Sequence, residues 1–467
     1  MNHARTKIVC TIGPASSDAG TIAALIDAGM NVARINFSHG THEEHARVIA
    51  AVRAAARTAG RPVAILADLQ GPRIRIGEIA VPVEVSDGGE LTFVPEHEAS
   101  GSDMPVTYPD LARDVGPGSR ILVNDGLLEF AVTEVNGNRV RVRTIHGGTV
   151  TSHKGMNLPG AEVSAPSLTD KDHDDIAFAI AHDVAYVALS FVRRASDIDA
   201  LRALLPKGML IVAKIEKDSA VDRIEDILRT TDAVMVARGD LGVELPFERV
   251  PLEQKRIIAL AQRHGRPVIT ATQMLESMIE NPRPTRAEAN DVANAVMDGT
   301  DAVMLSAETA SGKHPVLAVE AMHRIAFAAE TYPVARGTGL DRLDPGTAGV
   351  EETIASATVT AVRLIGARCV IVFTKSGFSA RVVAGRRPAV PIVALTDQER
   401  TWRQLALVWG VVPFLVPHCD TYEEMAGVAR RLVIREGIAA AGDRVLITAG
   451  VPFDVPGSTN TLKVEQI

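Results

Sequence analysis

Eight short apolar runs constrain the fold of this chain more than any other feature of its sequence. Longer segments with helical periodicity alternate with the runs, and one long gap follows the third run. The runs cover residues 8–12, 32–37, 63–68, 185–191, 209–215, 233–237, 267–272 and 302–306. Strand and helix patterns that alternate in this way favour parallel strands joined by helices. Eight such units predict an α/β fold built on a closed (β/α)8 barrel, the TIM barrel.

The gap after the third run has a different sequence pattern from the rest of the chain. Residues 69–164 contain short alternating pieces and turn signals such as Asp87-Gly88-Gly89, with little helical periodicity. This pattern predicts an inserted β domain, a β-barrel lid, placed where the barrel strands end. Its ends, at Gly71-Pro72 and Pro159-Gly160, are expected to act as hinges that let the lid close over a substrate.

A third unit follows a segment rich in Gly, Asp and Pro at residues 336–346, which we interpret as a linker. Beyond it, strand patterns at residues 369–374, 392–395 and 445–448 alternate with helices and predict a C-terminal α/β domain. The expected domains are therefore the barrel at residues 1–68 and 165–338, the lid at 69–164 and the C-terminal domain at 345–467.

Composition excludes some classes of partner. The chain carries 49 Lys and Arg residues against 57 Asp and Glu residues, and a net charge of −8 argues against general binding to nucleic acid or to anionic membranes. Its three cysteines are widely spaced and odd in number, which fits a reducing compartment. No apolar stretch at the N-terminus or elsewhere reaches the length of a signal or a membrane span, so we expect a cytoplasmic protein.

Two of the runs end in a cation and a carboxylate two residues apart. Lys214 and Glu216 close the run at 209–215, and Arg238 and Asp240 follow the run at 233–237. In an extended strand, residues two apart point to the same side, so each pair is expected to face one way. Two carboxylates from neighbouring strand ends can hold a hard divalent cation, and the cations suit a phosphorylated substrate. We therefore predict metal-assisted phosphoryl chemistry.

Other runs also end in polar residues, and the C-terminal rim of such a barrel is where catalytic groups are placed. A single polar residue there can simply mark the end of a strand, but a set of complementary groups is harder to explain in that way. The further rim residues are Arg34, Asn36, Asp68, Ser190, Thr272, Ser306 and Glu308.

Several motifs have both a structural and a functional interpretation. His39, His42 and His45 could suggest a metal, but surface and helix-cap positions are favoured for them. Thr285 and Glu288 have the spacing of a helix capping box, and a structural role is favoured. The loop at residues 374–379 could bind a phosphate at a helix N-terminus or could be an ordinary turn. Neither GxxxxGK[ST] nor GxGxxG occurs in the chain, so a nucleotide would need another device.

Taken together, five segments resemble the signatures of pyruvate kinases, in that family's order and over essentially the whole chain. They are residues 7–14, 31–39, 235–244, 269–278 and 281–288. The resemblance implies a phosphotransferase that moves the phosphoryl group of phosphoenolpyruvate to ADP, giving ATP and an enolate that is protonated to pyruvate, in the final step of glycolysis.

The resemblance also implies roles for the rim residues. Glu216 and Asp240 would bind Mg²⁺ or Mn²⁺, and Lys214 would stabilise the charge of the phosphoryl group in flight. Arg34 would hold the phosphate, while the backbone of Gly239 and Asp240 and the hydroxyl of Thr272 would seat the carboxylate. Ser306 and Glu308 would belong to a water-linked relay that protonates the enolate. The positions matching nucleotide or monovalent-cation contacts are Asn36, Phe37, Ser38, His39, Arg75 and Lys154.

A departure from the family pattern concerns potassium. The family's K⁺-dependent members carry an acidic residue after the third strand, beside a Thr-Lys pair, whereas this chain has Arg73 in that position and Leu69-Gln70 in place of the pair. Such a basic group is similar to the K⁺-independent branch, in which a fixed cation replaces the ion. We therefore expect K⁺ to be dispensable, although a K⁺ site, if used, would involve residues Asn36, Ser38, Asp68 and Leu69.

The C-terminal domain departs from the family as well. Its loop resembles the family's effector-phosphate pocket, through residues Thr374, Lys375, Ser376, Gly377 and Ser379. The late loop at 451–458 lacks the Trp and Arg that grip the second phosphate of fructose 1,6-bisphosphate. A monophosphorylated sugar or nucleotide is therefore the expected allosteric effector, acting on a homotetramer like that of the family.

Two other functions stay open on the sequence alone. A metal-dependent barrel enzyme such as a pyruvate-forming aldolase would also need a divalent ion and an enolate-stabilising cation, and dependence on ADP separates the two enzymes. A regulatory protein without catalytic activity could use the same fold. The intact charges of Lys214, Glu216 and Asp240 argue against it, because clustered charge is costly to keep without a use.

Overall fold

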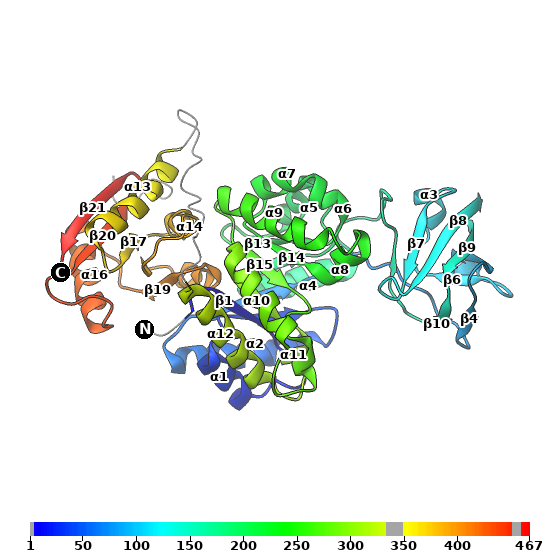
Figure 1. The fold of residues 1–467 in the computed structure, drawn as a ribbon, viewed down its shortest axis with the longest axis horizontal. Helices are drawn as coiled ribbons and strands as arrows, with labels where there is room; N and C mark the ends of the chain where they lie inside the picture. Colours follow the sequence, from blue (N-terminus) through cyan, green and yellow to red (C-terminus); the bar gives the residue numbers. More distant parts are fainter. Residues whose placement is uncertain (1–3, 333–348, 451–458) are drawn as a thin grey trace.

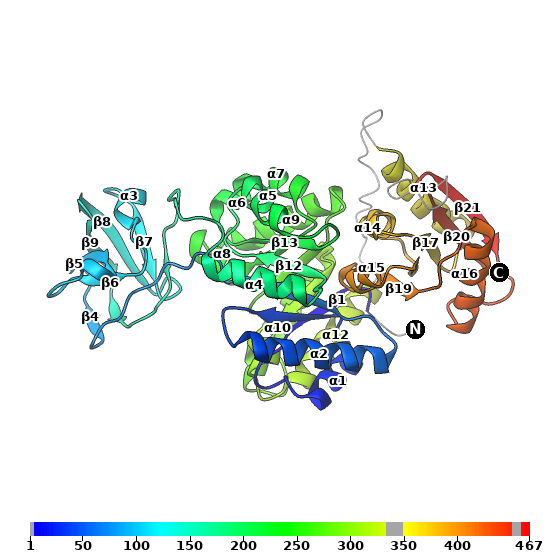
Figure 2. The same ribbon diagram turned by 180° about the vertical axis from the view of Figure 1, so that it is seen from behind.

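The computed structural model describes residues 4–332, 349–450 and 459–467. Three units lie in a row along its long axis, with the inserted β unit at one end, the barrel in the middle and the C-terminal α/β unit at the other end (Figure 1). The view from behind, in which left and right are exchanged, also has the barrel in the middle (Figure 2). The linker expected at 336–346 and the late loop at 451–458 lie outside the described residues.

Eight parallel strands form the closed barrel that the sequence predicts. They are β1 (Lys7–Thr11), β2 (Val32–Asn36), β3 (Ala64–Asp68), β12 (Tyr186–Leu189), β13 (Leu210–Ile215), β14 (Ala233–Ala237), β15 (Val268–Ala271) and β16 (Ala302–Leu305). The hydrogen-bonded order around the ring is β1-β16-β15-β14-β13-β12-β3-β2, and β2 pairs with β1 to close it. The ring brings the C-terminal ends of all eight strands to one rim.

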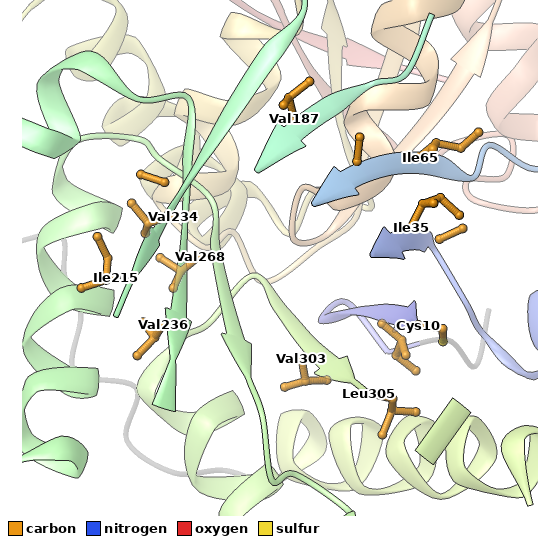
Figure 3. Close-up of a cluster of buried hydrophobic side chains, with 14 of the residues drawn as sticks. Cys10, Ile35, Ile65, Val187, Ile215, Val234, Val236, Val268, Val303 and Leu305 are labelled. Carbon is orange, nitrogen blue, oxygen red and sulfur yellow. The ribbon is translucent and has the colours of Figure 1, made fainter. Parts of the chain in front are cut away.

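Both faces of the barrel strands are buried, which is why their sequences are continuous apolar runs rather than alternating ones. One set of side chains packs between strands and helices, and Figure 3 shows members of this cluster such as Ile35, Ile65 and Val234. The alternate residues, such as Leu66, Val212 and Met235, belong to a second cluster. Two residues of the C-terminal unit, Ala406 and Leu407, join that second cluster. The C-terminal unit therefore packs against the barrel core.

Helices surround the barrel (Figures 1 and 2). They are α1 (Ala19–Ala28), α2 (His42–Ala59), α4 (Asp170–Ala181), α5 (Ala195–Leu204), α6 (Asp218–Asp222), α7 (Ile224–Thr230), α8 (Arg238–Glu244), α9 (Val250–Arg263), α10 (Arg286–Asp298), α11 (Ala307–Ala310) and α12 (Pro315–Thr331). The capping box predicted at Thr285 and Glu288 is confirmed, because the Thr285 side chain accepts from the Glu288 amide and the Glu288 side chain accepts from the Thr285 amide.

The inserted unit is a β structure, as expected. Its elements are β4 (Val83–Val85), β5 (Glu90–Pro95), β6 (Met104–Val106), α3 (Leu111–Asp114), β7 (Arg120–Val123), β8 (Leu128–Asn136), β9 (Arg139–His146), β10 (Gly148–Val150) and β11 (Met156–Asn157). Six strands form a sheet in the order β11-β7-β8-β9-β5-β6, and β4 pairs with β10. Isolated bridges from Arg75 to Gly155 and from Ile76 to Val106 join the two edges of this sheet. The segment that enters the lid therefore closes its barrel.

The C-terminal unit is an α/β layer structure. Its elements are α13 (Val350–Ile365), β17 (Val370–Phe373), α14 (Phe378–Gly385), β18 (Ile392–Thr396), α15 (Glu399–Gln404), β19 (Val411–Leu415), α16 (Tyr422–Arg435), β20 (Arg444–Ala449) and β21 (Thr461–Gln466). The sheet order is β19-β18-β17-β20-β21, with β21 antiparallel to β20. The sequence interpretation named β17, β18 and β20 but not β19 or β21. Within the described ranges, no helix has the length and apolar character needed to cross a membrane.

Candidate active site

Lys214, at the end of β13, lies at the centre of a buried group of charges on the barrel rim. Its Nζ is 2.8 Å from the Ser190 hydroxyl, 3.0 Å from a Glu216 oxygen and 3.3 Å from an Asp68 oxygen. Burial on its own would lower the pKa of Lys214, but attraction to Asp68 and Glu216 outweighs burial and raises it. Lys214 is therefore a fixed, protonated cation.

Asp68, at the end of β3, links Lys214 to Arg34 on β2. One Asp68 oxygen lies 2.6 Å from Nε of Arg34, and a further Arg34 nitrogen donates to the Thr11 hydroxyl at 2.9 Å. The Asp68 side chain is 1% exposed. Although burial raises the pKa of a carboxyl, the charges of Lys214 and Arg34 outweigh it and lower the pKa of Asp68. A buried carboxylate thus holds two cations in place beside each other.

Glu216 and Asp240 bring two carboxylates to the same part of the rim. Glu216 is buried, and its second oxygen accepts the Phe191 amide at 2.7 Å. The pKa of Asp240 is raised to about 6, first by burial and then by the negative charge of Glu216. Two carboxylates that repel each other in a buried place are a donor set that a divalent cation would neutralise, and their oxygens suit Mg²⁺ or Mn²⁺.

The prediction that Arg238 and Asp240 share a strand face is wrong. Strand β14 ends at Ala237, and helix α8 begins at Arg238. Residues two apart in a helix point about 200° apart, so the two side chains diverge. Asp240 lines the cavity below the lid, whereas Arg238 lies 2.7 Å from Asp291 of α10. The expected pairing of a cation and a carboxylate therefore holds at β13 and fails at β14.

Thr272 and Gly239 form a hydrogen-bonded pair beside Asp240. The Thr272 hydroxyl accepts the Gly239 amide at 2.8 Å and donates to the Ala271 carbonyl at 2.6 Å. Thr272 and Gln273 both have a positive φ, 67° and 53°. Positive φ is strained for a β-branched residue, so the surrounding contacts must hold Thr272 in this conformation.

Ser306 and Glu308 lie at the end of β16, where both were expected. The Ser306 amide donates to one Glu308 oxygen at 2.7 Å, and the Leu275 amide donates to the other at 3.1 Å. Burial raises the pKa of Glu308, and these amide bonds only partly oppose the effect. Glu308 thus ties the loop after β15 to the end of β16.

A cavity of about 950 Å³ opens beside Arg34. It contains Asn36 and His39, which the sequence connected with a nucleotide, together with Ser306. It also contains residues that the sequence interpretation did not name, including Ser17, Glu44 and Arg47. The Phe37 side chain is buried and packs against His45 and Phe178, and Ser38 donates its amide to the Asn36 side chain at 3.2 Å.

A second cavity, of about 360 Å³, lies between the lid and the barrel and is lined by residues of both. Arg73 and Arg75 line it together with Asp240, and the charge of Arg73 partly opposes the rise in the pKa of Asp240. Lys154 is flanked by two lining residues, His153 and Gly155. Of the expected nucleotide residues, Asn36 and His39 thus line the larger cavity, and Arg75 lines the smaller one.

The positions considered for a K⁺ site are neighbours. Asn36 on β2 pairs in register with Asp68 on β3, and the Leu69 carbonyl follows directly and accepts the Ser190 hydroxyl at 2.7 Å. Both oxygens of Asp68 face cations, Arg34 and Lys214. The site already carries positive charge beside these oxygens.

The histidines at 39, 42 and 45 do not form a metal centre. His42 lies 2.7 Å from Asp175, and His45 is buried against Phe37 rather than on the surface. In the part of the chain that the structure describes, no group of three or more His, Cys, Asp or Glu side chains is placed to hold a metal. The pair Glu216 and Asp240 would need ligands from a substrate or water as well.

The loop at 374–379 connects β17 to α14. Its Gly377 has a φ of 76° and donates its amide to the Thr374 hydroxyl at 2.9 Å. Lys375 pairs with Asp397, and the Lys375 carbonyl accepts from Thr401 at 2.7 Å. Ser376 is exposed, whereas Ser379 is buried and contacts Thr459.

Comparisons with known proteins identify relatives over the whole chain. Residues 3–319 match the family model "Pyruvate kinase, barrel domain", and residues 352–465 match "Pyruvate kinase, alpha/beta domain". The chain is 46% identical to a pyruvate kinase of Geobacillus stearothermophilus, over 99% of this chain and 80% of that protein. It is 44% identical to one of Mycobacterium intracellulare, over 99% of this chain and 98% of the relative.

A solved structure is also similar. The pyruvate kinase of Cryptosporidium parvum superposes with a TM-score of 0.93 and 35% identity, covering 100% of this chain and 96% of that one. Both domains of the family are present, in the family's order. The chain therefore belongs to the pyruvate kinase family, the phosphotransferases that transfer the phosphoryl group of phosphoenolpyruvate to ADP and so form pyruvate and ATP.

Proposed function

We propose that the buried charges around Lys214 are the phosphoryl-transfer centre of this enzyme. The observation that carries the proposal is that Asp68 and Glu216 hold the Lys214 ammonium within 3.3 Å and 3.0 Å, in a buried place beside Asp240. A fixed cation needs no reorganisation when charge develops on the transferring group. Lys214 then stabilises the phosphoryl group while the P–O bond to enolpyruvate breaks and a bond to an ADP oxygen forms.

Glu216 and Asp240 would hold Mg²⁺ or Mn²⁺. The repulsion that raises the pKa of Asp240 supports this assignment, because a bound dication would remove the repulsion. When bound, the ion neutralises charge on the phosphoryl and enolate oxygens. The Lys214 contact to Glu216 orients one ligand, and the Phe191 amide orients it further.

The remaining rim groups would bind the substrate. Arg34, fixed by Asp68, suits the phosphate, because a guanidinium offers several donors to its oxygens. The Gly239 amide and the Thr272 hydroxyl, which lie together, suit the carboxylate. Ser306 lines the larger cavity and would pass a proton to the enolate through water, with Glu308 holding its backbone.

Residues of both cavities would bind the nucleotide. Asn36 and His39 lie in the larger cavity, and Arg75 and Lys154 belong to the lid side. Closure of the lid would bring the two sets together and exclude water from the transfer. Ser38 and Phe37 would contribute through their backbone, since the Phe37 side chain is buried.

Arg73 would make K⁺ dispensable. It shares the smaller cavity with Asp240, and its charge partly opposes the rise in the pKa of that carboxyl, so it already acts as a positive charge near the metal ligands. A fixed guanidinium there can replace the charge of a bound monovalent cation.

The division of labour that we propose follows the expected domains. The barrel (1–68 and 165–338) carries the chemistry, the lid (69–164) closes it, and the C-terminal domain (345–467) binds a phosphorylated effector at the loop 374–379. We further propose a cytoplasmic homotetramer. The buried, unpaired thiols of Cys10, Cys369 and Cys419 support a reducing compartment.

A coupled assay tests the central proposal. Pyruvate formation from phosphoenolpyruvate, ADP and Mg²⁺ is followed with each component omitted, for the wild type and for Lys214→Met. We expect turnover to require ADP and Mg²⁺ and the variant to lose about 10³-fold in kcat. Lys255→Met is the matched control, because Lys255 pairs with Asp298 on the outer helices, and it should stay within about twofold. Pyruvate formation without ADP would favour an aldolase instead.

The effector site has its own test. If a monophosphorylated sugar or nucleotide activates the wild type, replacing Ser376 and Ser379 with Ala should abolish that activation and leave basal turnover unchanged. Unchanged activation in the double variant would move the effector site away from the loop.

A further inference from the structure

The side chain of Arg238 contacts the loop that carries Thr272 and has no role in the proposed chemistry. Its Nε donates to the Ala271 carbonyl at 3.2 Å, and a terminal nitrogen donates to the Thr272 carbonyl at 2.7 Å and reaches the Gln273 carbonyl at 3.4 Å. Three successive carbonyls are thus held by one guanidinium. A planar fork with five donors suits contacts that are spread in this way, whereas an ammonium places its three donors on a single atom.

Asp291 of α10 fixes the guanidinium from the other side. Its two oxygens lie 2.8 Å and 2.7 Å from the two terminal nitrogens of Arg238, the bidentate geometry. The Arg238 side chain is 12% exposed. Another neighbour, the buried Gln254 of α9, lies 3.4 Å from the same guanidinium. Arg238 is therefore anchored to the outer helices and not to the substrate cavity.

The carbonyls that Arg238 holds belong to the strained part of the rim. Thr272 and Gln273 are consecutive residues with positive φ, and such strain persists only where surrounding contacts determine it. Gly239, which follows Arg238 in the chain, donates its amide to the Thr272 hydroxyl. The first turn of α8 thus donates two hydrogen bonds to Thr272, one from Arg238 to its carbonyl and one from Gly239 to its hydroxyl.

We propose that Arg238, anchored by Asp291, is a positioning residue that holds the Thr272 hydroxyl and the Gly239 amide in register for the substrate carboxylate. The inference rests on the role proposed for Thr272. Arg238 acts through Thr272 and does not touch the substrate. Its loss lets the 271–273 backbone relax, which moves the hydroxyl away from the place where the carboxylate binds.

Steady-state kinetics of Arg238→Lys test the inference. We expect kcat/KM for phosphoenolpyruvate to fall by about 10- to 100-fold, largely through a higher KM, because small displacements of a positioned group cost that much. The KM for ADP should stay within about twofold. The matched control is Arg266→Lys. Arg266 precedes the opposite end of β15 and donates to the Leu228 carbonyl at 3.0 Å, so it loses an equivalent backbone contact far from the rim.

A double-variant cycle separates positioning from a general loss of structure. Thr272→Ala is measured alone and combined with Arg238→Lys. If Arg238 acts through Thr272, the combined variant loses no more kcat/KM for phosphoenolpyruvate than Thr272→Ala does. Losses that multiply, or a KM for phosphoenolpyruvate that Arg238→Lys leaves unchanged, overturn the inference.

The same set distinguishes this inference from the proposal on which it rests. Should Thr272→Ala itself retain full kcat/KM, the role proposed for Thr272 fails. Should Thr272→Ala lose activity while Arg238→Lys does not, only the role of Arg238 fails. Asp291→Asn provides a milder perturbation in case Arg238→Lys does not fold, and it should raise the KM for phosphoenolpyruvate in the same direction by a smaller factor.

Discussion

The ends of β13 and β14 carry the same kind of sequence, a cation and a carboxylate two residues apart, and use it in different ways. At β13 the chain stays extended, so Lys214 and Glu216 lie 3.0 Å apart in the site. At β14 a helix begins at once, so Asp240 lines the cavity and Arg238 points to α10. The backbone at the point of turning therefore decides whether a charge becomes part of the chemistry or supports it.

The largest expected difference between the two ends comes from the carboxylates that anchor each cation. Asp68→Asn removes a charge that holds both Lys214 and Arg34 in a buried place, whereas Asp291→Asn removes the half-exposed anchor of Arg238. Breaking a buried ion pair on one side costs about 3–5 kcal/mol of stability. We expect Asp68→Asn to lose that free energy of unfolding and about 100-fold in kcat.

Asp291→Asn is the comparison for this variant. It should leave kcat within about threefold and change mainly the KM for phosphoenolpyruvate. Denaturant unfolding and steady-state kinetics of both variants measure the difference. Equal losses of kcat in the two would mean that the two strand ends do not have separate roles.

The two proposed metal ligands should respond in opposite ways when no metal is present. Asp240→Asn removes the repulsion between Asp240 and Glu216, so we expect an unchanged or higher melting temperature in EDTA. Glu216→Gln takes a partner from the buried Lys214, so its melting temperature should fall. Both should raise the Mg²⁺ concentration for half-maximal activity by about tenfold or more. Thermal shifts in the same direction would contradict the geometry of the pair.

Arg73 extends the comparison to the root of the lid. In Arg73→Glu the fixed positive charge near Asp240 becomes negative, and we expect activity without K⁺ to fall about tenfold and KCl to restore it. Arg113→Glu, at an exposed position of the lid, is the matched control. Initial rates are measured at constant ionic strength with tetramethylammonium in place of K⁺. A wild type that loses its turnover without K⁺ would show that Arg73 does not replace the ion.

The smallest effect is expected for His418, an exposed residue of the C-terminal domain that pairs with Asp397. The hydrogen bond to Asp397 raises the pKa of His418 above its value in the unfolded chain. The resulting stabilisation is complete below the unfolded pKa of about 6.5 and is lost as pH rises through the higher folded value. His418→Gln should therefore lower the melting temperature by about 1 °C at pH 5.5 and leave it unchanged at pH 8.5. A loss of melting temperature that grows as the pH rises would contradict a raised pKa of His418 in the folded protein.

The sequence predicted the barrel well because the burial of both strand faces gives each strand an uninterrupted apolar run. Strands β19 and β21 were missed for local reasons. Strand β19 contains Pro413, which cannot donate to a ladder, and β21 carries Lys463 and Glu465. The sequence also contained no sign that the two edges of the lid sheet are joined, because two isolated bridges join them rather than a strand.

The active site was predictable where the side chain follows a strand and unpredictable where a distant element decides. The two-residue repeat of side chains along a strand predicted Lys214 beside Glu216, and this is correct. No local pattern indicates that Asp68 would join Lys214 to Arg34, since this depends on which strands are neighbours in the ring. The direction predicted for the Arg238 side chain was wrong, because two other features determine it. One is the early start of α8, and the other is Asp291, 53 positions further along the chain.

The bridges at Arg75 and Ile76 have a consequence for anyone who would exchange lids between relatives. A lid cut out so that it begins after residue 77 would keep its strands but lose the segment that bridges β11 and β6. Both edges of its sheet would then be unpaired and open to other strands. Arg73 and Arg75 would stay behind with the barrel. A successful graft must therefore carry the entering segment with it, and in doing so it transplants part of the substrate cavity.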